Sequence, residues 1–367
     1  MRLLLFTGKG GVGKTTLAAA TAARVADSGD KALVVSTDPA HSLADAFGAR
    51  LGAEPSEVDR GLWAAHIDAR ALADKSWPAL RAKARALFAG LGIEAIDAEE
   101  LAVLPGVDDL LALSEVVRLA ADGPWKAVVV DCGPTAETLR LLALPEAAAG
   151  YLGRFGELRK LAERMARLRS VLADPAVTGV RLVLTPERLV VAETRRTLTA
   201  LALRGIAVDA LIANRLVPKP RRWSGPAANW LKVRRSEQDA VLSELDLALP
   251  LHVVEHRSAE PVGLPALRAL AEELYGSDDP LAAGAERAPL LAIAADGPDQ
   301  LLTVAFPLTE SAALDLARVG DDLVVTVDGV RRLIALPLML RRHAVTDAEA
   351  TATGLVVRFA PGDEEHP

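Results

Sequence analysis

The sequence contains almost no cysteine. Of its 367 residues only Cys132 is a cysteine, so one chain can form neither an internal disulfide nor a zinc site built from cysteine pairs. Proteins that rely on disulfide frameworks are thereby excluded, and the composition fits a reducing compartment. We therefore expect a cytoplasmic protein.

Long apolar runs are also missing. Apolar residues make up 51% of the chain, but charges interrupt every stretch before it reaches the roughly 20 residues that span a bilayer. We expect no integral membrane segment. The formal net charge of -7 disfavours general affinity for nucleic acid. The chain is nevertheless long enough to bury a large core without metal or disulfide staples.

What the sequence does have is an alternation of short apolar runs with segments of helical period, which is typical of an α/β fold with a mostly parallel, doubly wound sheet. The runs that we expect to be strands are 3–7, 32–37, 127–130, 180–184 and 208–213, and those that we expect to be helices include 17–27 and 187–203. Residues 151–174 combine an apolar face with many arginines. We expect them to form a helical insertion outside the sheet core.

The composition changes after residue 275. Residues 276–289 are acidic, small and broken by proline, as in a linker. Residues 290–361 contain short alternating runs separated by turn residues, which predicts a small all-β sandwich. The expected organisation is thus a domain over residues 1–275, a linker, and a second domain over residues 290–361.

A glycine-rich loop follows the first expected strand. Residues 8–15 match G-x-x-x-x-G-K-[ST] and precede an Ala-rich helix, the context that a phosphate-binding P-loop requires. Backbone N–H groups and the helix N-terminus hold the phosphates, Lys14 reaches the terminal phosphates, and Thr15 offers a hydroxyl to Mg²⁺. We expect ATP and Mg as ligands. The predicted nucleotide-binding residues of the loop are Gly8, Lys9, Gly10, Gly11, Val12, Gly13, Lys14, Thr15 and Thr16.

Two acidic residues end neighbouring expected strands. Asp38 follows the run 32–37, where a carboxylate can orient or deprotonate an attacking water. The alternative is that Asp38, which precedes a proline, caps a helix. Asp131 ends the buried run 127–130, the form of a Walker B element, and is expected to hold Mg²⁺ through water. Thr15, Asp38 and Asp131 are thus the predicted metal residues, and Asp38, Lys9 and Lys14 the predicted catalytic ones.

The loop GKGGVGKTT and the string STDPAHSL at residues 36–43 carry a family resemblance. The early Lys9 resembles the deviant Walker A loop of the MinD, ParA and ArsA superfamily, and the string resembles switch I of the ArsA and tail-anchored-protein-targeting (GET) ATPases. The resemblance implies a homodimer in which Lys9 contacts the partner's nucleotide. It also implies that Asn214 binds the purine, with the loop 253–263 and its Pro261 as the other wall. Alternatively, Lys9 is a solvated surface lysine.

The resemblance covers residues 1 to about 275 and has departures. The stretch 132–142 is similar to switch II of the family, but Ala136 and Glu137 stand where the pattern has Gly-His. The zinc-binding CxxC pair of the eukaryotic targeting factors is missing, and so are the several cysteines of the arsenite pumps. The chain also has only three methionines, whereas the targeting factors hold clients with a methionine-rich insertion. We interpret Cys132 as a small packing residue rather than a nucleophile.

Two further segments leave their roles open. Residues 219–235 are basic and contain Trp223 and Trp230, which is compatible with binding RNA or an anionic membrane, but a solvated helix face is the interpretation we prefer in an acidic chain. The pattern of residues 288–361 resembles an α-crystallin (small heat-shock protein) sandwich. Such modules are associated with holding apolar protein segments, although an inert sandwich is the alternative.

Three functions are consistent with these features. The first is an ATP-hydrolysing homodimeric switch that captures apolar protein segments or membrane-protein clients. The second is an anion-efflux ATPase of the arsenite type, which the single cysteine disfavours. The third is a nucleotide-dependent protein-interaction switch without client binding.

Overall fold

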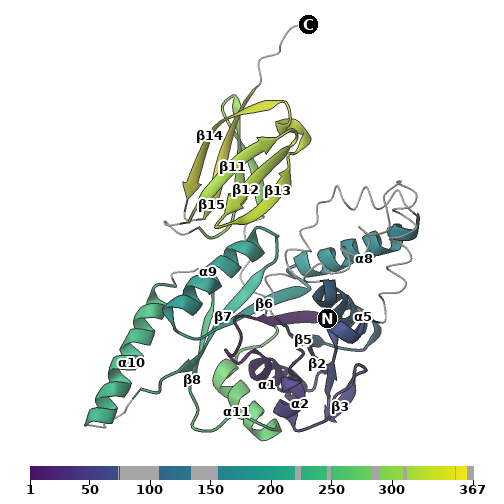
Figure 1. The fold of residues 1–367 in the computed structure, drawn as a ribbon, viewed down its shortest axis with the longest axis vertical. Coiled ribbons are helices and arrows are strands. Elements are labelled where there is room, and N and C mark those ends of the chain that lie inside the picture. Colours follow the sequence, from purple (N-terminus) through teal and green to yellow (C-terminus); the bar gives the residue numbers. More distant parts are fainter. Residues whose placement is uncertain are drawn as a thin grey trace. The chain divides into compact units, whose positions relative to one another are not determined.

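The computed structural model describes residues 1–72, 74, 107–133, 156–219, 225–245, 249–282, 290–308, 312–351 and 353–361. The chain divides into two compact units. The first comprises Met1–Val191 with Ala207–Gly284, and the second comprises Ala192–Ile206 with Ala285–Pro367. Figure 1 labels the elements of both units. No helix within the described ranges is both long and apolar enough to cross a membrane.

The first unit is built on an eight-stranded sheet in the order β3-β4-β2-β5-β1-β6-β7-β8. Every neighbouring pair is parallel except β3 with β4. Strands β1, β2, β5 and β6 are buried at every position, as expected for a parallel sheet covered on both faces. The predicted α/β fold is confirmed. The strands are β1 (Arg2–Thr7), β2 (Ala32–Ser36), β3 (Ser56–Asp59), β4 (Leu62–His66), β5 (Ala127–Asp131), β6 (Thr178–Leu184), β7 (Val208–Leu216) and β8 (Leu251–Glu255).

Helices α1, α8 and α11 pack on strands of this sheet. The helices of the first unit are α1 (Lys14–Asp27), α2 (Ser42–Phe47), α5 (Val107–Asp122), α8 (Gly156–Ala173), α10 (Pro226–Ser243) and α11 (Leu264–Tyr275), and α9 (Arg188–Ala202) gives most of its residues to the second unit. Helix α1 packs on β5 and α11 (Figure 1), and the hydroxyls of Thr21 and Tyr275 are hydrogen-bonded at 2.8 Å. This pair fixes α11 beside the helix that starts at the phosphate loop.

Helix α8 falls in the segment that we expected outside the sheet core. Its C-terminal half instead packs against β6 and α5, and Leu168 and Leu172 are each only 2% exposed. The arginines misled the prediction, because they lie on a helix whose leucines cover the sheet. The first five residues of the predicted insertion, 151–155, lie outside the described residues.

The second unit is an antiparallel β-sandwich, as the alternating runs predict. Its sheets have the orders β14-β15-β10-β9 and β11-β12-β13. Leu302, Val304, Leu323, Val325 and Val357 form part of its core together with Leu203. The strands are β9 (Leu291–Asp296), β10 (Asp299–Ala305), β11 (Leu314–Val319), β12 (Asp322–Val327), β13 (Val330–Ala335), β14 (His343–Thr351) and β15 (Gly354–Pro361), with a 3-10 turn η2 (Leu338–Leu340).

A histidine in β8 makes the stability of the first unit depend on pH. The ring of His252 meets Tyr275 edge-on with centroids 5.8 Å apart. Burial lowers the pKa of His252 from 6.5, and the positive charge of Arg181 lowers it further, while Asp278 acts in the opposite direction. The folded protein therefore favours the neutral imidazole.

We predict that His252 contributes to acid destabilisation. As pH falls from above 6.5 toward the lower folded pKa, the unfolded chain takes up a proton that the folded chain resists, so stability is lost. His252→Gln has no such proton, and its thermal midpoint should decline less than that of the wild type between pH 7.5 and 5.5. The measurement is the difference between the two midpoints at each pH. An unchanged difference would contradict the prediction.

Candidate functional site

The glycine-rich loop joins β1 to α1 and passes close to the ends of β6 and β7. Gly8 has φ 148° and Gly13 has φ 96°, backbone angles that residues other than glycine rarely adopt. A Cβ on Gly8 would lie 2.1 Å from the Val183 carbonyl oxygen, and one on Gly13 would lie 2.4 Å from Asn214 Nδ2. Both glycines are therefore required by the fold of the loop. A Cβ on Gly10 or Gly11 would meet no described atom within 4 Å, so space remains at the middle of the loop.

Lys14 and Thr15 are the first residues of α1, and their side chains form hydrogen bonds with different residues. Lys14 is 8% exposed, and its Nζ donates to the Lys9 carbonyl oxygen at 3.3 Å. The Thr15 hydroxyl donates to Asp131 Oδ2 at 2.8 Å. The loop lysine is thus folded over the loop, and the loop threonine reaches the end of β5.

Asp131 is completely buried between β1 and β2. Its Oδ2 accepts from Thr15 and also from the Ser36 hydroxyl at 3.0 Å, while its Oδ1 has no hydrogen-bond partner among the described residues. Burial raises the pKa of Asp131 to about 6, and the bonds from Thr15 and Ser36 oppose this. A buried carboxylate oxygen without a hydrogen-bond partner lowers the stability of the fold, so Asp131 Oδ1 is a position where a further ligand would bind favourably.

These residues fit a magnesium ion. Mg²⁺ prefers oxygen ligands and keeps several of its waters. The cluster offers only oxygens, from Thr15, Ser36 and Asp131, beside the predicted phosphate site. Of the predicted metal residues, Thr15 and Asp131 are in direct contact, whereas Asp38 adjoins them through Ser36, whose hydroxyl oxygen accepts from the Asp38 N–H at 3.2 Å.

Asp38 closes a local turn in this conformation. Its Oδ1 accepts from the Ala40 N–H at 3.0 Å. The residue that precedes α2 is His41, with φ 55°, so Asp38 does not cap that helix. The His41 ring lies against His66 with centroids 4.1 Å apart, a contact that no sequence pattern indicated. Burial lowers the pKa of His66, and the neighbouring His41 adds to this effect.

Thr37 links the ends of β2 and β5. Its N–H donates to the Asp131 carbonyl oxygen at 3.0 Å, and its hydroxyl accepts from the Gly133 N–H at 3.3 Å. We call this arrangement the Thr37 clip. It joins the segment that leads into Asp38 to the segment that follows Asp131. The predicted switch II residues 134–142 lie outside the described residues.

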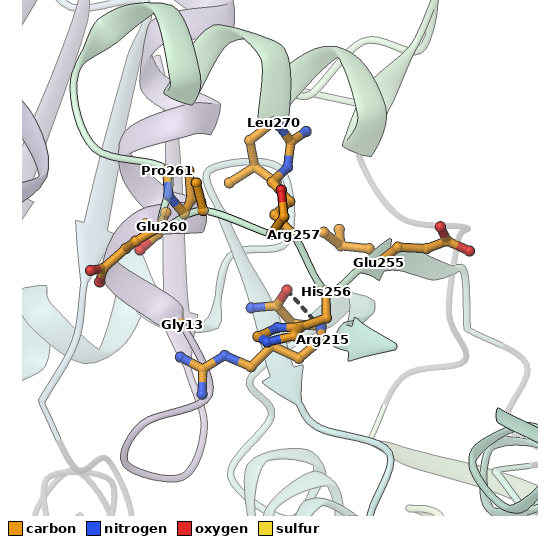
Figure 2. Close-up of a pocket in the computed structure, with 13 residues that line it drawn as sticks. Gly13, Arg215, Glu255, His256, Arg257, Glu260, Pro261 and Leu270 are labelled. Carbon is orange, nitrogen blue, oxygen red and sulfur yellow. Dashed lines mark hydrogen bonds between the residues drawn. The ribbon is translucent and has the colours of Figure 1, made fainter. Parts of the chain in front are cut away.

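A cavity of about 420 Å³ adjoins the loop (Figure 2). It brings together predicted residues from distant parts of the sequence, namely Asn214, Pro261, Gly13 and Thr16. Asn214 Nδ2 donates to the Val12 carbonyl oxygen at 2.8 Å, so this amide also supports the loop. The full lining is Gly13, Thr16, Asn214, Arg215, Val254, Glu255, His256, Arg257, Ser258, Ala259, Glu260, Pro261 and Leu270.

A second cavity of about 290 Å³ is lined by the first half of the loop. Lys9 is exposed there, at the surface of the unit. Sequence reasoning did not select Arg215, which lines both cavities. The one feature of the sequence that could have indicated Arg215 as a site residue is its position directly after Asn214. The other lining residues are Gly10, Gly11, Val12, Thr185, Glu187, Val190 and Gln238.

The arrangement has the chemistry of a nucleotide site. The N-terminus of α1 and the loop amides attract anions, Lys14 supplies a charge, and the oxygen cluster at Asp131 suits a cation that accompanies phosphates. The cavity beside Asn214 offers space for a base next to the phosphate loop.

Comparisons with known proteins agree with this geometry. The family model described as anion-transporting ATPase matches residues 1–169 and 155–276, and an HSP20-like domain found in ArsA matches residues 299–359. Protein Rv2184c of Mycobacterium tuberculosis is 37% identical over 100% of this chain and 97% of its own length. A protein of Chlorobaculum tepidum, provisionally named arsenical pump-driving ATPase, is 31% identical over 93% of this chain and 91% of its own.

The ATPase GET3C of Arabidopsis thaliana is 31% identical over 74% of this chain and 81% of its own length. The match to the family model covers well over half of the chain, and the relatives match it nearly end to end or over most of its length. The chain therefore belongs to the ArsA family of anion-transporting ATPases, which hydrolyse ATP, and it carries the HSP20-like domain found in that family.

Proposed function

We propose that this ATPase is a homodimeric, Mg-dependent switch that uses ATP binding and hydrolysis to capture and release apolar protein segments. The observation that carries the proposal is the Thr37 clip. It connects Gly133, which follows Asp131, with the residue before Asp38, and Asp38 is expected to orient the attacking water. A switch needs such a connection between the nucleotide and another part of the fold.

The residues of the loop hold and orient the triphosphate. The backbone N–H groups of residues 10–15 and the N-terminus of α1 bind the phosphate oxygens. Lys14 leaves the Lys9 carbonyl oxygen to reach the terminal phosphates. Thr15 and Asp131 would hold Mg²⁺, which would supply charge that offsets the negative charge of the phosphates.

Asp38 orients the water that attacks the terminal phosphorus. Its carboxylate exchanges the Ala40 N–H for a hydrogen bond from that water, and it accepts the proton as the bond to the ADP oxygen breaks. Because Thr37 precedes Asp38 directly, this movement acts on the Gly133 N–H through the clip. Hydrolysis thereby acts on Gly133, just after the end of β5.

The second unit supports a client role. Four strands, β9, β11, β13 and β14, lie at the edges of its two sheets, and edge strands offer unpaired backbone groups to an extended segment. Apolar side chains are exposed on the same unit: Leu338 is 80% exposed, Val319 60% and Met339 56%. A partly extended apolar segment is the ligand that these features fit best.

The names of several relatives suggest arsenite efflux as a second function. A soft metalloid needs several thiolates. Cys132 is 4% exposed and is the sole cysteine of the chain, so its thiol alone cannot supply such a set. We therefore place client capture first, with a client-free interaction switch as the third candidate.

The client role is tested by incubating the purified chain with a peptide that contains one uninterrupted apolar segment. We expect stable retention of the peptide in at least one of the ATP, ADP and nucleotide-free states, and suppressed aggregation of it. A scrambled, charged peptide of equal length is the control. The role is wrong if no nucleotide state retains the peptide, and stimulation of hydrolysis by arsenite or antimonite would support efflux instead.

We predict that Asp38→Asn leaves ATP binding nearly intact and lowers the rate of hydrolysis by about 10²–10⁴-fold, the range typical of a lost general base. Asp45→Asn is the control, because Asp45 is an exposed carboxylate of the same segment. ATP affinity is measured by calorimetry and the rate by phosphate release. Equal rates for Asp38→Asn and the wild type would overturn the assignment of Asp38.

We predict that Lys9→Ala removes the part of the ATPase rate that rises with protein concentration. If Lys9 acts on the partner's nucleotide, the loss should approach the roughly 10³-fold or greater effect of an arginine finger in trans. Lys31→Ala, a change of another exposed lysine in the first unit, should retain the concentration-dependent rate. A rate that is independent of concentration in the wild type would contradict a role across a dimer.

A further inference from the structure

Strand β7 has one residue more than its partner at the nucleotide site. Ala213 pairs with Val253 and Leu216 pairs with Glu255, so three steps along β7 match two steps along β8. This register shift is a β-bulge. Ala213 is fully buried and Leu216 is 1% exposed, so the core fixes both ends of the bulge. The two residues between them, Asn214 and Arg215, are displaced from the regular alternation of the strand.

The bulge places Arg215 in a backbone conformation that arginine rarely adopts. Its φ is 62°, one of three positive values among the described residues other than glycine. Such a conformation is unfavourable for residues that carry a side chain, and it is concentrated at functional sites. Glycine would adopt it without this cost, so the arginine side chain is the feature of interest.

Hydrogen bonds tie this conformation to the phosphate loop. The Arg215 N–H donates to Asn214 Oδ1 at 2.9 Å, and the same amide donates through Nδ2 to the Val12 carbonyl oxygen at 2.8 Å. The backbone of Arg215 is therefore held relative to the loop through a single side chain.

The Arg215 side chain extends from this point toward the loop. Figure 2 shows it running toward Gly13 in the cavity that it shares with His256. It also lines the second cavity, which contains Lys9, Gly10 and Gly11. Arg215 thus lines two cavities that adjoin the loop.

Two of the three carboxylates that line these cavities, Glu255 and Glu187 but not Glu260, form ion pairs with other residues. Glu255 lies 3.2 Å from Arg235, and Glu187 lies 3.8 Å from Arg234. The guanidinium of Arg215 forms no ion pair with any of the residues that the structure describes. A cation that shares a cavity with Lys9, close to the loop that precedes α1, is repelled by these positive charges unless an anion lies between them.

We propose that Arg215 is a phosphate-binding residue of the nucleotide site. Its planar guanidinium can bind two phosphate oxygens at once, which a lysine cannot do. This inference rests on the proposed binding of nucleotide at the loop. It adds to that proposal a third cation, placed by the bulge of β7 rather than by the loop itself.

The test measures binding of ATP, ADP and inorganic pyrophosphate to the full chain and to Arg215→Gln by calorimetry in the presence of Mg²⁺. We expect all three affinities to fall by a similar factor of roughly 10- to 100-fold, which corresponds to the loss of a hydrogen bond to a charged group. Arg215→Lys should recover part of the loss. Arg50→Gln removes one exposed arginine elsewhere and should bind like the wild type.

Arg215→Gly separates binding from folding. It removes the side chain and also relieves the positive φ, so its thermal midpoint should equal or exceed that of the wild type while its ATP affinity falls as in Arg215→Gln. Equal ATP affinities in wild type and Arg215→Gln would overturn the role of Arg215. The role would also be overturned if Arg215→Gln lost affinity for ATP and ADP but bound pyrophosphate as tightly as the wild type. Failure of the wild type itself to bind ATP would instead refute the nucleotide site.

Discussion

The site depends on one buried carboxylate. Asp131 ends a central strand, is completely removed from solvent, and accepts hydrogen bonds from the first turn of α1 and from the end of β2. Removing this charge from water is unfavourable, and the raised pKa reflects that cost. The hydroxyls of Thr15 and Ser36 offset part of it. Strands β2 and β5 and helix α1 must therefore keep their relative positions. The carboxyl ends of the two strands and the start of the helix lie together at the nucleotide site.

Much of this arrangement could be predicted from the sequence. The loop residues, Asp38 and Asp131 follow strands whose apolar runs are easy to recognise, and parallel strands bring their carboxyl ends to one edge of the sheet. Asn214 and Pro261 were inferred from resemblance, and they do line one cavity with the loop. The all-β pattern after residue 290 likewise predicted the sandwich.

The remainder could not be predicted because it depends on tertiary contacts. The β7 bulge follows from the way in which Ala213 and Leu216 are both buried, which periodicity over so few residues does not reveal. The arginines of α8 masked the leucines that pack on the sheet. The pattern of residues 187–203 predicts one helix, but it does not reveal that residues 192–206 belong to the second unit, whose core includes Leu203.

The bond from Lys14 to the Lys9 carbonyl oxygen has a consequence for turnover. This bond gives the ammonium an acceptor within its own loop, and it holds the start of the loop close to the start of α1. The protein then does not have to order the loop afresh for each incoming nucleotide. Successive cycles exchange one acceptor for another at a preformed site, which limits the entropy lost on binding.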